Sequence, residues 1–252
     1  MPGLGDELDN IMSNKNTWRE FINGLLSSKE FSNRLDFLPD GKRLMSESNG
    51  FKFWFDTADR EMGAKMATCN YEPETCTLIK KLIKPGMSCL DVGAQTGFYT
   101  CMMAQLVGST GGVIAFEPMD RSFNLINKNV DENGWKDRVS IHHVACSDFS
   151  GDIVVGIESV MVVADSKGDH IIESIKIDDL SLGHVDFCKI DIEGHEPKAL
   201  RGMKQLVSTA APVILTEVNQ YWLTQAGSSA DEYINLLGEL GYILFDIESD
   251  FH

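Results

Sequence analysis

The residues with the clearest chemical potential form a short run, DVGAQTG, which lies between two apolar segments. Gly93 and Gly97 allow the backbone to turn sharply, and a helix that begins after Gly97 would point its N-terminus at a ligand held there. Asp91 opens the run with a carboxylate, and Glu117 follows the next apolar segment. Two carboxylates beside a glycine turn favour a ligand that carries amine or hydroxyl donors.

The spacing of the glycines separates two classes of ligand. A dinucleotide fingerprint reads G-x-G-x-x-G, and its glycines seat a pyrophosphate on a helix N-terminus. Gln95 stands where the middle glycine would be, so this pattern fails. The remaining acid and G-x-x-x-G suit a ligand with an amino acid end and a ribose, such as S-adenosylmethionine. Glu117 is placed to accept hydrogen bonds from both ribose hydroxyls.

A second group of polar residues, Asp191, Glu193 and His195, follows another apolar segment. Methyl transfer needs an attacking atom held in line with the methyl group, and a base helps where that atom is a hydroxyl. We expect His195 to be this base, because its ordinary pKa is closest to neutrality. Asp191 and Glu193 are further catalytic candidates, or ligands of cofactor or substrate.

Two other interpretations of these residues stay open. Each could simply cap a turn or lie solvated at the surface. Together with Glu217, they could also form an oxygen-rich Mg²⁺ or Ca²⁺ site that lowers the pKa of a substrate hydroxyl. Carboxylates near a cofactor pocket are common without a metal, so no metal is expected.

These polar residues lie at the ends of strands in a regular alternation of strands and helices. Strands are expected at 87–93, 112–118, 139–147, 185–191, 212–218 and 242–247. Helices are expected at 73–83, 98–107, 120–133, 197–207 and 229–240, with Asp120 as the N-cap of the third. Short β-like pieces at 151–157 and 170–177 indicate an inserted hairpin or meander. The alternation predicts an α/β fold with a Rossmann-like, doubly wound, mostly parallel sheet, whose ligands bind at the carboxyl ends of the strands.

Residues 1–70 are expected to form an N-terminal helical extension with a lead-in strand, and residues 71–252 the ligand-binding domain. Apolar residues recur at helical spacing in 17–38, which indicates an amphipathic helix or helix pair. This segment either packs on the core or joins two copies in a homodimer. The run FKFWFD at 51–56 alternates like a strand.

Four runs of the sequence together resemble a known family. LDVGAQTGFYT, FEP, ACSD and KIDIEGHE are similar to the motifs of the FkbM-type family of S-adenosylmethionine-dependent methyltransferases, which have the class I methyltransferase fold. The resemblance implies that Asp91, Gly93 and Gly97 line the methionine end of the cofactor. It also implies that Glu117 holds the ribose and that Asp148 lies near the adenine amine.

Ala94, Gln95 and Pro118 complete the cofactor-binding residues that we expect. The family more often has Asn at the position of Gln95. Methyltransferases of this class also usually finish with an antiparallel hairpin, whereas this sequence stops soon after the strand expected at 242–247. The segment 51–56 could instead occupy another edge of the sheet, or the chain could be trimmed.

The composition limits the partners. The 252 residues carry a formal net charge of −16, so the chain as a whole repels nucleic acid and anionic membranes. The six cysteines include no C-x-x-C pair, which indicates neither zinc nor a disulfide framework. The sequence has no secretory signal and no apolar stretch long enough to span a membrane, so we expect a cytoplasmic protein.

The sequence therefore predicts an S-adenosylmethionine-dependent methyltransferase. The resemblance implies O-methylation of a hydroxyl on a small molecule or a carbohydrate, and this acceptor class rests on analogy alone. Two alternatives remain. One is an NAD-type oxidoreductase of similar fold, against which the missing middle glycine argues. The other is a non-catalytic binding module on a methyltransferase fold.

Overall fold

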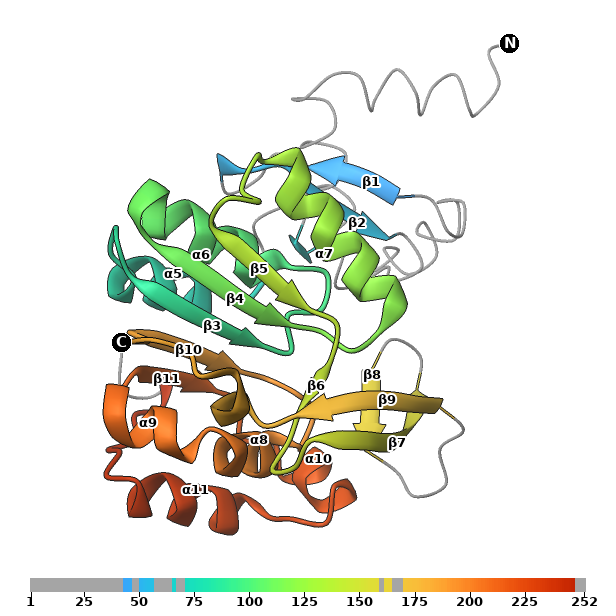
Figure 1. Cartoon of the computed structure of the whole chain (residues 1–252), viewed down its shortest axis with the longest axis vertical. Coiled ribbons are helices and arrows are strands. Elements are labelled where there is room, and N and C mark those ends of the chain that lie inside the picture. The colour runs from blue at the N-terminus through green and yellow to red at the C-terminus, as the bar shows by residue number, and fades with distance from the viewer. Residues whose placement is uncertain are drawn as a thin grey trace, which may run out of the picture. The chain divides into compact units, whose positions relative to one another are not determined.

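The computed structural model describes residues 43–46, 50–56, 65–66, 71–158, 161–164 and 170–247 (Figure 1). The chain divides into two compact units, Met1–Pro73 and Glu74–His252. In the first unit, β1 (Arg43–Ser46) pairs antiparallel with β2 (Phe53–Asp56), so a strand does form within 51–56. The helix expected at 17–38 lies outside the described residues.

A five-stranded parallel sheet forms the centre of the second unit. Its strands are β3 (Ser88–Val92), β4 (Gly112–Phe116), β5 (Val139–His142), β10 (Phe187–Ile190) and β11 (Val213–Thr216). They lie in the order β11-β10-β3-β4-β5, and every neighbouring pair is parallel. The order of the strands reverses between β3 and β10. This is the switch point at which doubly wound sheets bind ligands.

Helices cover both faces of this sheet. The helices are α5 (Pro73–Leu82), α6 (Phe98–Val107), α7 (Asp120–Glu132), α8 (Glu196–Gly202), α9 (Lys204–Ala210), α10 (Gln220–Gln225) and α11 (Ala230–Glu239). Leu90 and Val92 share one core with apolar residues of α8, α9, α10 and α11. Side chains alternate along a strand, so Asp91 lies on the opposite face, where it contacts Thr100 of α6. The predicted doubly wound fold is confirmed.

A small second sheet interrupts the alternation. It consists of β6 (Ala145–Cys146), β7 (Gly151–Glu158), β8 (Met161–Ala164) and β9 (His170–Ile175), in the order β6-β9-β7-β8. β7 and β8 form the expected inserted hairpin, whereas β9 pairs antiparallel with β7 and not with β8, so the described strands do not form a meander. Figure 1 shows this sheet on the side toward which the arrowheads of β4 and β10 point. It therefore lies near the carboxyl ends of the parallel strands.

The single strand expected at 139–147 is wrong. β5 ends at His142 in the large sheet, and β6 begins at Ala145 and pairs with β9 in the small one. The apolar pattern continues through the break, so periodicity could not reveal the change of sheet.

The single helix expected at 197–207 is also wrong, because α8 ends at Gly202 and α9 begins at Lys204. A Cβ on Gly202 would lie 1.8 Å from the carbonyl oxygen of Ser147, so only glycine allows this approach. The low helix propensity of glycine also favours a break here.

Three smaller differences from the predicted elements concern a strand, a helix cap and a short helix. The strand expected at 242–247 is wrong, since this segment pairs with no strand among the described residues and Ile243 is 80% exposed. Asp120 does not cap α7 but is its first residue, and Met119 takes the cap position without a side-chain bond. The short helix α10 was not predicted; it begins where the side chain of Asn219 accepts two backbone N–H groups.

The approach of α8 to Ser147 gives a first prediction. We expect Gly202→Ala to lower the free energy of unfolding by about 2 kcal/mol or more, because the added methyl group meets rigid backbone. Gly238→Ala, within α11, is the matched control, since a Cβ there meets nothing. It should raise stability by about 0.5 to 1 kcal/mol. Urea unfolding measures both, and equally small effects would contradict the close approach.

Candidate functional site

The loop at 93–97 connects β3 to α6 at the switch point. Gly93, Gln95 and Gly97 have φ angles of 84°, 49° and 87°, all in the left-handed region. A Cβ on Gly93 would lie 2.0 Å from the carbonyl oxygen of Asp191, so this position requires glycine. Gln95 adopts its angle without that freedom. Asn, the more frequent family residue there, does so more readily.

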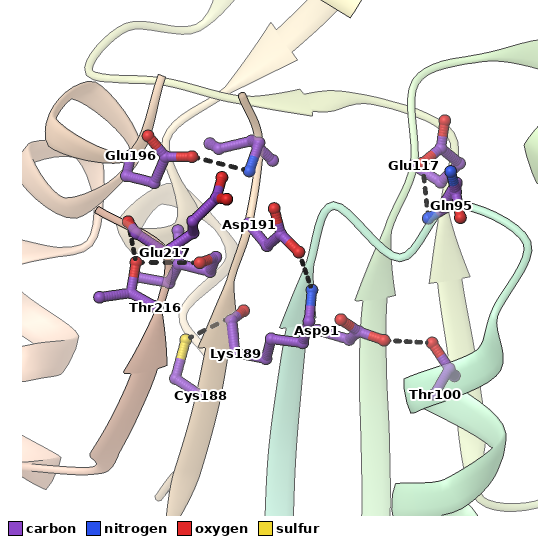
Figure 2. Close-up of polar contacts among 12 residues, drawn as sticks. Asp91, Gln95, Thr100, Glu117, Cys188, Lys189, Asp191, Glu196, Thr216 and Glu217 are labelled. Atoms are coloured by element: carbon purple, nitrogen blue, oxygen red, sulfur yellow. Dashed lines mark hydrogen bonds and ion pairs between the residues drawn. The ribbon is translucent and has the colours of Figure 1, made fainter. Parts of the chain in front are cut away.

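Glu117 lies beside this loop, at the carboxyl end of β4 (Figure 2). Its Oε2 accepts the backbone N–H of Gln95 at 2.8 Å, and its Oε1 accepts that of Met119 at 2.9 Å. The side chain is 5% exposed. Burial raises the pKa of Glu117 to about 7, although the two hydrogen bonds oppose this shift. Each oxygen keeps a further lone pair, so the carboxylate can still accept hydrogen bonds from a ligand.

Asp91 lies on the other side of the loop and is fully buried. Its Oδ2 accepts the hydroxyl of Thr100 at 2.5 Å, whereas its Oδ1 has no hydrogen-bond partner among the described residues. Burial raises the pKa of Asp91, and the charge of Lys189 opposes this. Asp91 and Lys189 are register partners on adjacent strands, so their side chains lie on the same face of the sheet.

Lys189 places a buried cation between two carboxylates. Its side chain is 5% exposed, and its Nζ donates to Oδ2 of Asp191 at 2.9 Å. Figure 2 shows the ammonium between the carboxyl groups of Asp191 and Asp91. The same nitrogen lies 5.0 Å from the centre of the Tyr99 ring, a cation–π distance. One ammonium thus offsets the burial of negative charge on both strands.

Sequence reasoning missed this role of Lys189. The signal was present, because the lysine stands between Cys188 and Ile190 in a strand that is otherwise apolar. A lysine in a buried strand is rare unless it has a partner.

Glu193 occupies the turn after β10 with a φ of 53°, which is unusual for a residue with a side chain. Its Oε2 is buried and has no hydrogen-bond partner among the described residues. Burial raises the pKa of Glu193 to about 7, and the charges of Asp191, Glu217 and Glu196 add to the shift. This carboxyl group therefore titrates near neutral pH.

Glu196 holds the same turn in place. Its Oε1 accepts the backbone N–H of Ile192 at 2.9 Å and that of Gly194 at 3.2 Å. A Cβ on Gly194 would lie 2.2 Å from the carbonyl oxygen of Trp222, so the turn also packs against α10. Glu196 was not among the expected site residues. Its backbone contacts fix the position of the neighbouring Glu193.

His195 contacts a different part of the site. The ring is 9% exposed, its Nε2 lies 3.1 Å from the hydroxyl of Ser147, and its Nδ1 has no partner among the described residues. Burial lowers the pKa of His195 to about 4, and the charge of Lys198 contributes. An imidazole with this pKa is neutral but only weakly basic at pH 7.

The remaining expected residues surround the loop or follow β6. Ala94 is buried, and its N–H donates to the carbonyl of Phe116 at 3.0 Å, which ties the loop to β4. Pro118 is partly buried directly after Glu117. Asp148 is exposed, and its Oδ1 accepts the hydroxyl of Ser147 at 3.3 Å.

The side chains considered for a divalent cation do not assemble. In the described part of the chain, no group of three His, Cys, Asp or Glu side chains could hold a metal ion. His195 is instead engaged with Ser147, and Asp191 is bonded to Lys189.

Comparison with known proteins identifies the family. Residues 91–244 match the Methyltransferase FkbM domain. The chain belongs to this family. Together with the strand order of the central sheet, this assigns the FkbM protein to the fold of S-adenosylmethionine-dependent, class I methyltransferases. No described helix has the length and apolarity needed to cross a membrane.

Several solved structures resemble this FkbM protein. The FkbM methyltransferase of Methylobacillus flagellatus KT is 16% identical with a TM-score of 0.47, over 73% of this chain and 46% of that one. An S-adenosylmethionine-dependent O-methyltransferase of Thermotoga maritima is 18% identical with a TM-score of 0.43, over 82% and 65% of the two chains. The chain thus spans less than half of the Methylobacillus protein. No protein with a curated description matches the sequence.

The buried lysine gives a second prediction. Lys189→Met should lower the free energy of unfolding by about 3 kcal/mol or more, because it leaves the buried carboxylate of Asp91 and the partly buried one of Asp191 without their cation. The loss should shrink as the pH falls, since protonated Asp91 needs no cation. Lys176→Met, which breaks a solvent-exposed pair with Asp179, is the control and should change stability by about 0.5 kcal/mol or less. Urea unfolding at pH 5 and pH 8 tests this, and a pH-independent loss would contradict it.

Proposed function

We propose that the FkbM protein is an S-adenosylmethionine-dependent O-methyltransferase that acts on a hydroxyl of a small molecule or a carbohydrate. The observation that carries this proposal is the buried carboxylate of Glu117, bonded to the loop amide of Gln95 at the switch point of the sheet. Membership of the family supports the methyl donor. The choice of oxygen as acceptor atom rests on the acidic turn after β10.

The residues present fit S-adenosylmethionine. Glu117 has lone pairs for two neighbouring hydroxyls, and such donors would favour its charged form over the protonation that burial promotes. The exposed carboxylate of Asp148 can accept a hydrogen bond from the exocyclic amine of an adenine. Asp91 lies beneath the loop, where its charge and its unpartnered Oδ1 would favour an ammonium at the methionine end. Gln95 in place of the middle glycine argues against a pyrophosphate ligand.

We assign the proton acceptor to Glu193 in preference to His195. When bound, S-adenosylmethionine supplies an already activated methyl group, so the protein must mainly position the acceptor and take its proton. A pKa of about 7 matches Glu193 to this task, and its Oε2 has no competing donor among the described residues. Its left-handed backbone adds the strain that is often found at functional sites. An alcohol needs such a base, whereas a neutral amine does not, which supports an oxygen acceptor.

Calorimetric titration tests the cofactor. We expect S-adenosylhomocysteine to bind and NAD not to bind. Glu117→Ala should weaken the binding by about 1 to 3 kcal/mol, because charged hydrogen bonds to the ribose are lost. Glu239→Ala, an exposed glutamate in α11, is the matched control and should leave the affinity unchanged. Binding of NAD alone would indicate an oxidoreductase, and binding of neither ligand would indicate a non-catalytic module.

The pH dependence of turnover tests the base. With an acceptor found by screening hydroxyl compounds against methyl-labelled cofactor, the rate should rise with pH through about 7, because Glu193 accepts a proton only when ionised. Glu193→Gln should lower kcat by about 10² to 10⁴ and abolish this dependence. S-adenosylhomocysteine should still bind the variant, which separates the base from the cofactor site.

Stability gives a readout of Glu193 that needs no acceptor. The folded pKa of about 7 lies above the ordinary value of 4.5, so the folded state binds more protons between these values. The contribution of Glu193 to stability must therefore fall as the pH rises from about 4.5 to beyond 7. Glu193→Gln should lose less stability than the unaltered protein between pH 5 and pH 8. An unchanged difference between the two pH values would show that Glu193 does not titrate in this range.

A further inference from the structure

A chain of two hydrogen bonds connects the turn after β10 to the loop after β6. Nε2 of His195 lies 3.1 Å from the hydroxyl oxygen of Ser147, which in turn lies 3.3 Å from Oδ1 of Asp148. His195 is 9% exposed and Ser147 is fully buried, whereas Asp148 is exposed. The two hydrogen bonds thus connect the buried ring of His195 to an exposed carboxylate.

The number of available protons fixes which atom is the donor in each of these two hydrogen bonds. Ser147 has a single hydroxyl proton, and a carboxylate can only accept, so the proton goes to Asp148. The contact between Ser147 and His195 then requires Nε2 to be the donor. Nδ1 consequently carries the lone pair, and this is the atom without a partner among the described residues. A buried Nδ1–H without an acceptor would cost more, so the neutral Nε2–H form is favoured.

The backbone around Ser147 is fixed from two sides. Its N–H donates to the carbonyl of Ile175 at the end of β9, at 3.0 Å. Its carbonyl oxygen lies against Gly202 of α8, which leaves no room for a Cβ there. The backbone that carries the hydroxyl of Ser147 is therefore held in place between β9 and α8.

We propose that His195 is a positioning residue, which acts through Ser147 to orient the carboxylate of Asp148 toward the 6-amino group of the adenine. This inference rests on the proposed function, in which Asp148 lies at the adenine end of the cofactor. It gives His195 a role other than proton transfer and leaves Glu193 as the base. The neutral imidazole fits this role, because it must donate to Ser147 and not collect a proton.

The chemistry of the purine makes the role measurable. An adenine presents an N–H donor at position 6, which a carboxylate accepts. A hypoxanthine presents a carbonyl oxygen at this position. Two hydrogen-bond acceptors, this oxygen and the carboxylate of Asp148, would then face each other. A correctly oriented Asp148 should therefore distinguish S-adenosylhomocysteine from S-inosylhomocysteine, and a disoriented one should not.

The experiment compares the Kd values of these two compounds by calorimetry. The unaltered protein should prefer S-adenosylhomocysteine by about tenfold or more, the effect of one hydrogen bond to a charged group. His195→Leu and Ser147→Ala should each reduce this preference to about threefold or less. The double variant should reduce it no further, because both changes break the same chain. His195→Gln, which places an amide N–H near the position of Nε2, should retain most of the preference.

Each outcome decides the matter. If the preference survives in His195→Leu and Ser147→Ala while both variants bind S-adenosylhomocysteine, His195 does not position Asp148. If His195→Gln loses as much as His195→Leu, the effect comes from packing and the inference fails. If the unaltered protein binds S-adenosylhomocysteine without a preference, Asp148 does not recognise the amine and the inference fails, while the proposed function stands. Absence of binding to either compound would overturn the proposed function itself.

Discussion

The ammonium of Lys189, held between carboxylates of two adjacent strands, is the interaction on which the site depends. A parallel sheet has little polar character in its interior, yet the switch point of this one places Asp91 and Asp191 side by side at its carboxyl end. Their mutual repulsion would be large in a medium of low dielectric constant. The lysine offsets it, and the ring of Tyr99 covers part of the cation. The glycine loop can then close over this edge, with Gly93 directly against the backbone of Asp191.

Burial assigns different protonation behaviour to neighbouring polar groups. Burial raises the pKa of both Glu117 and Glu193 to about 7, but the smaller contributions from their neighbours differ. Glu117 is shielded between backbone N–H groups that a ligand would supplement, whereas Glu193 is surrounded by other acids. His195, two residues further on, has its pKa lowered because burial disfavours its charged form. Residues 193–195 therefore contain an acid that titrates near neutrality and an imidazole that stays neutral.

Much of the fold could be predicted from patterns that burial imposes. Strands covered on both faces must be apolar, and glycines mark the turns that follow them, so the five parallel strands and the loop at 93–97 were predictable. The carboxylates at the strand ends were predictable because they stand where each apolar run of the sequence stops. The passage of the chain from β5 to β6 was not, because an apolar pattern does not say which sheet a strand joins. The role of Lys189 depends on Asp91 and Tyr99, which lie far from it in the sequence, and the pKa values of Glu193 and His195 depend chiefly on burial in the folded chain.

The short strand β6 has a consequence for how proteins of this fold can change. Ala145 and Cys146 pair in parallel with Ser174 and Ile175, so the chain enters and leaves the inserted sheet at one place. The segment between these two ends begins with Ser147, which contacts His195, but none of its described strands pairs with a strand of the central sheet. Changing the length of a segment closed in this way adds only a small entropic cost. Beyond Ser147, the length of the insertion can therefore change without altering the order or register of the central strands.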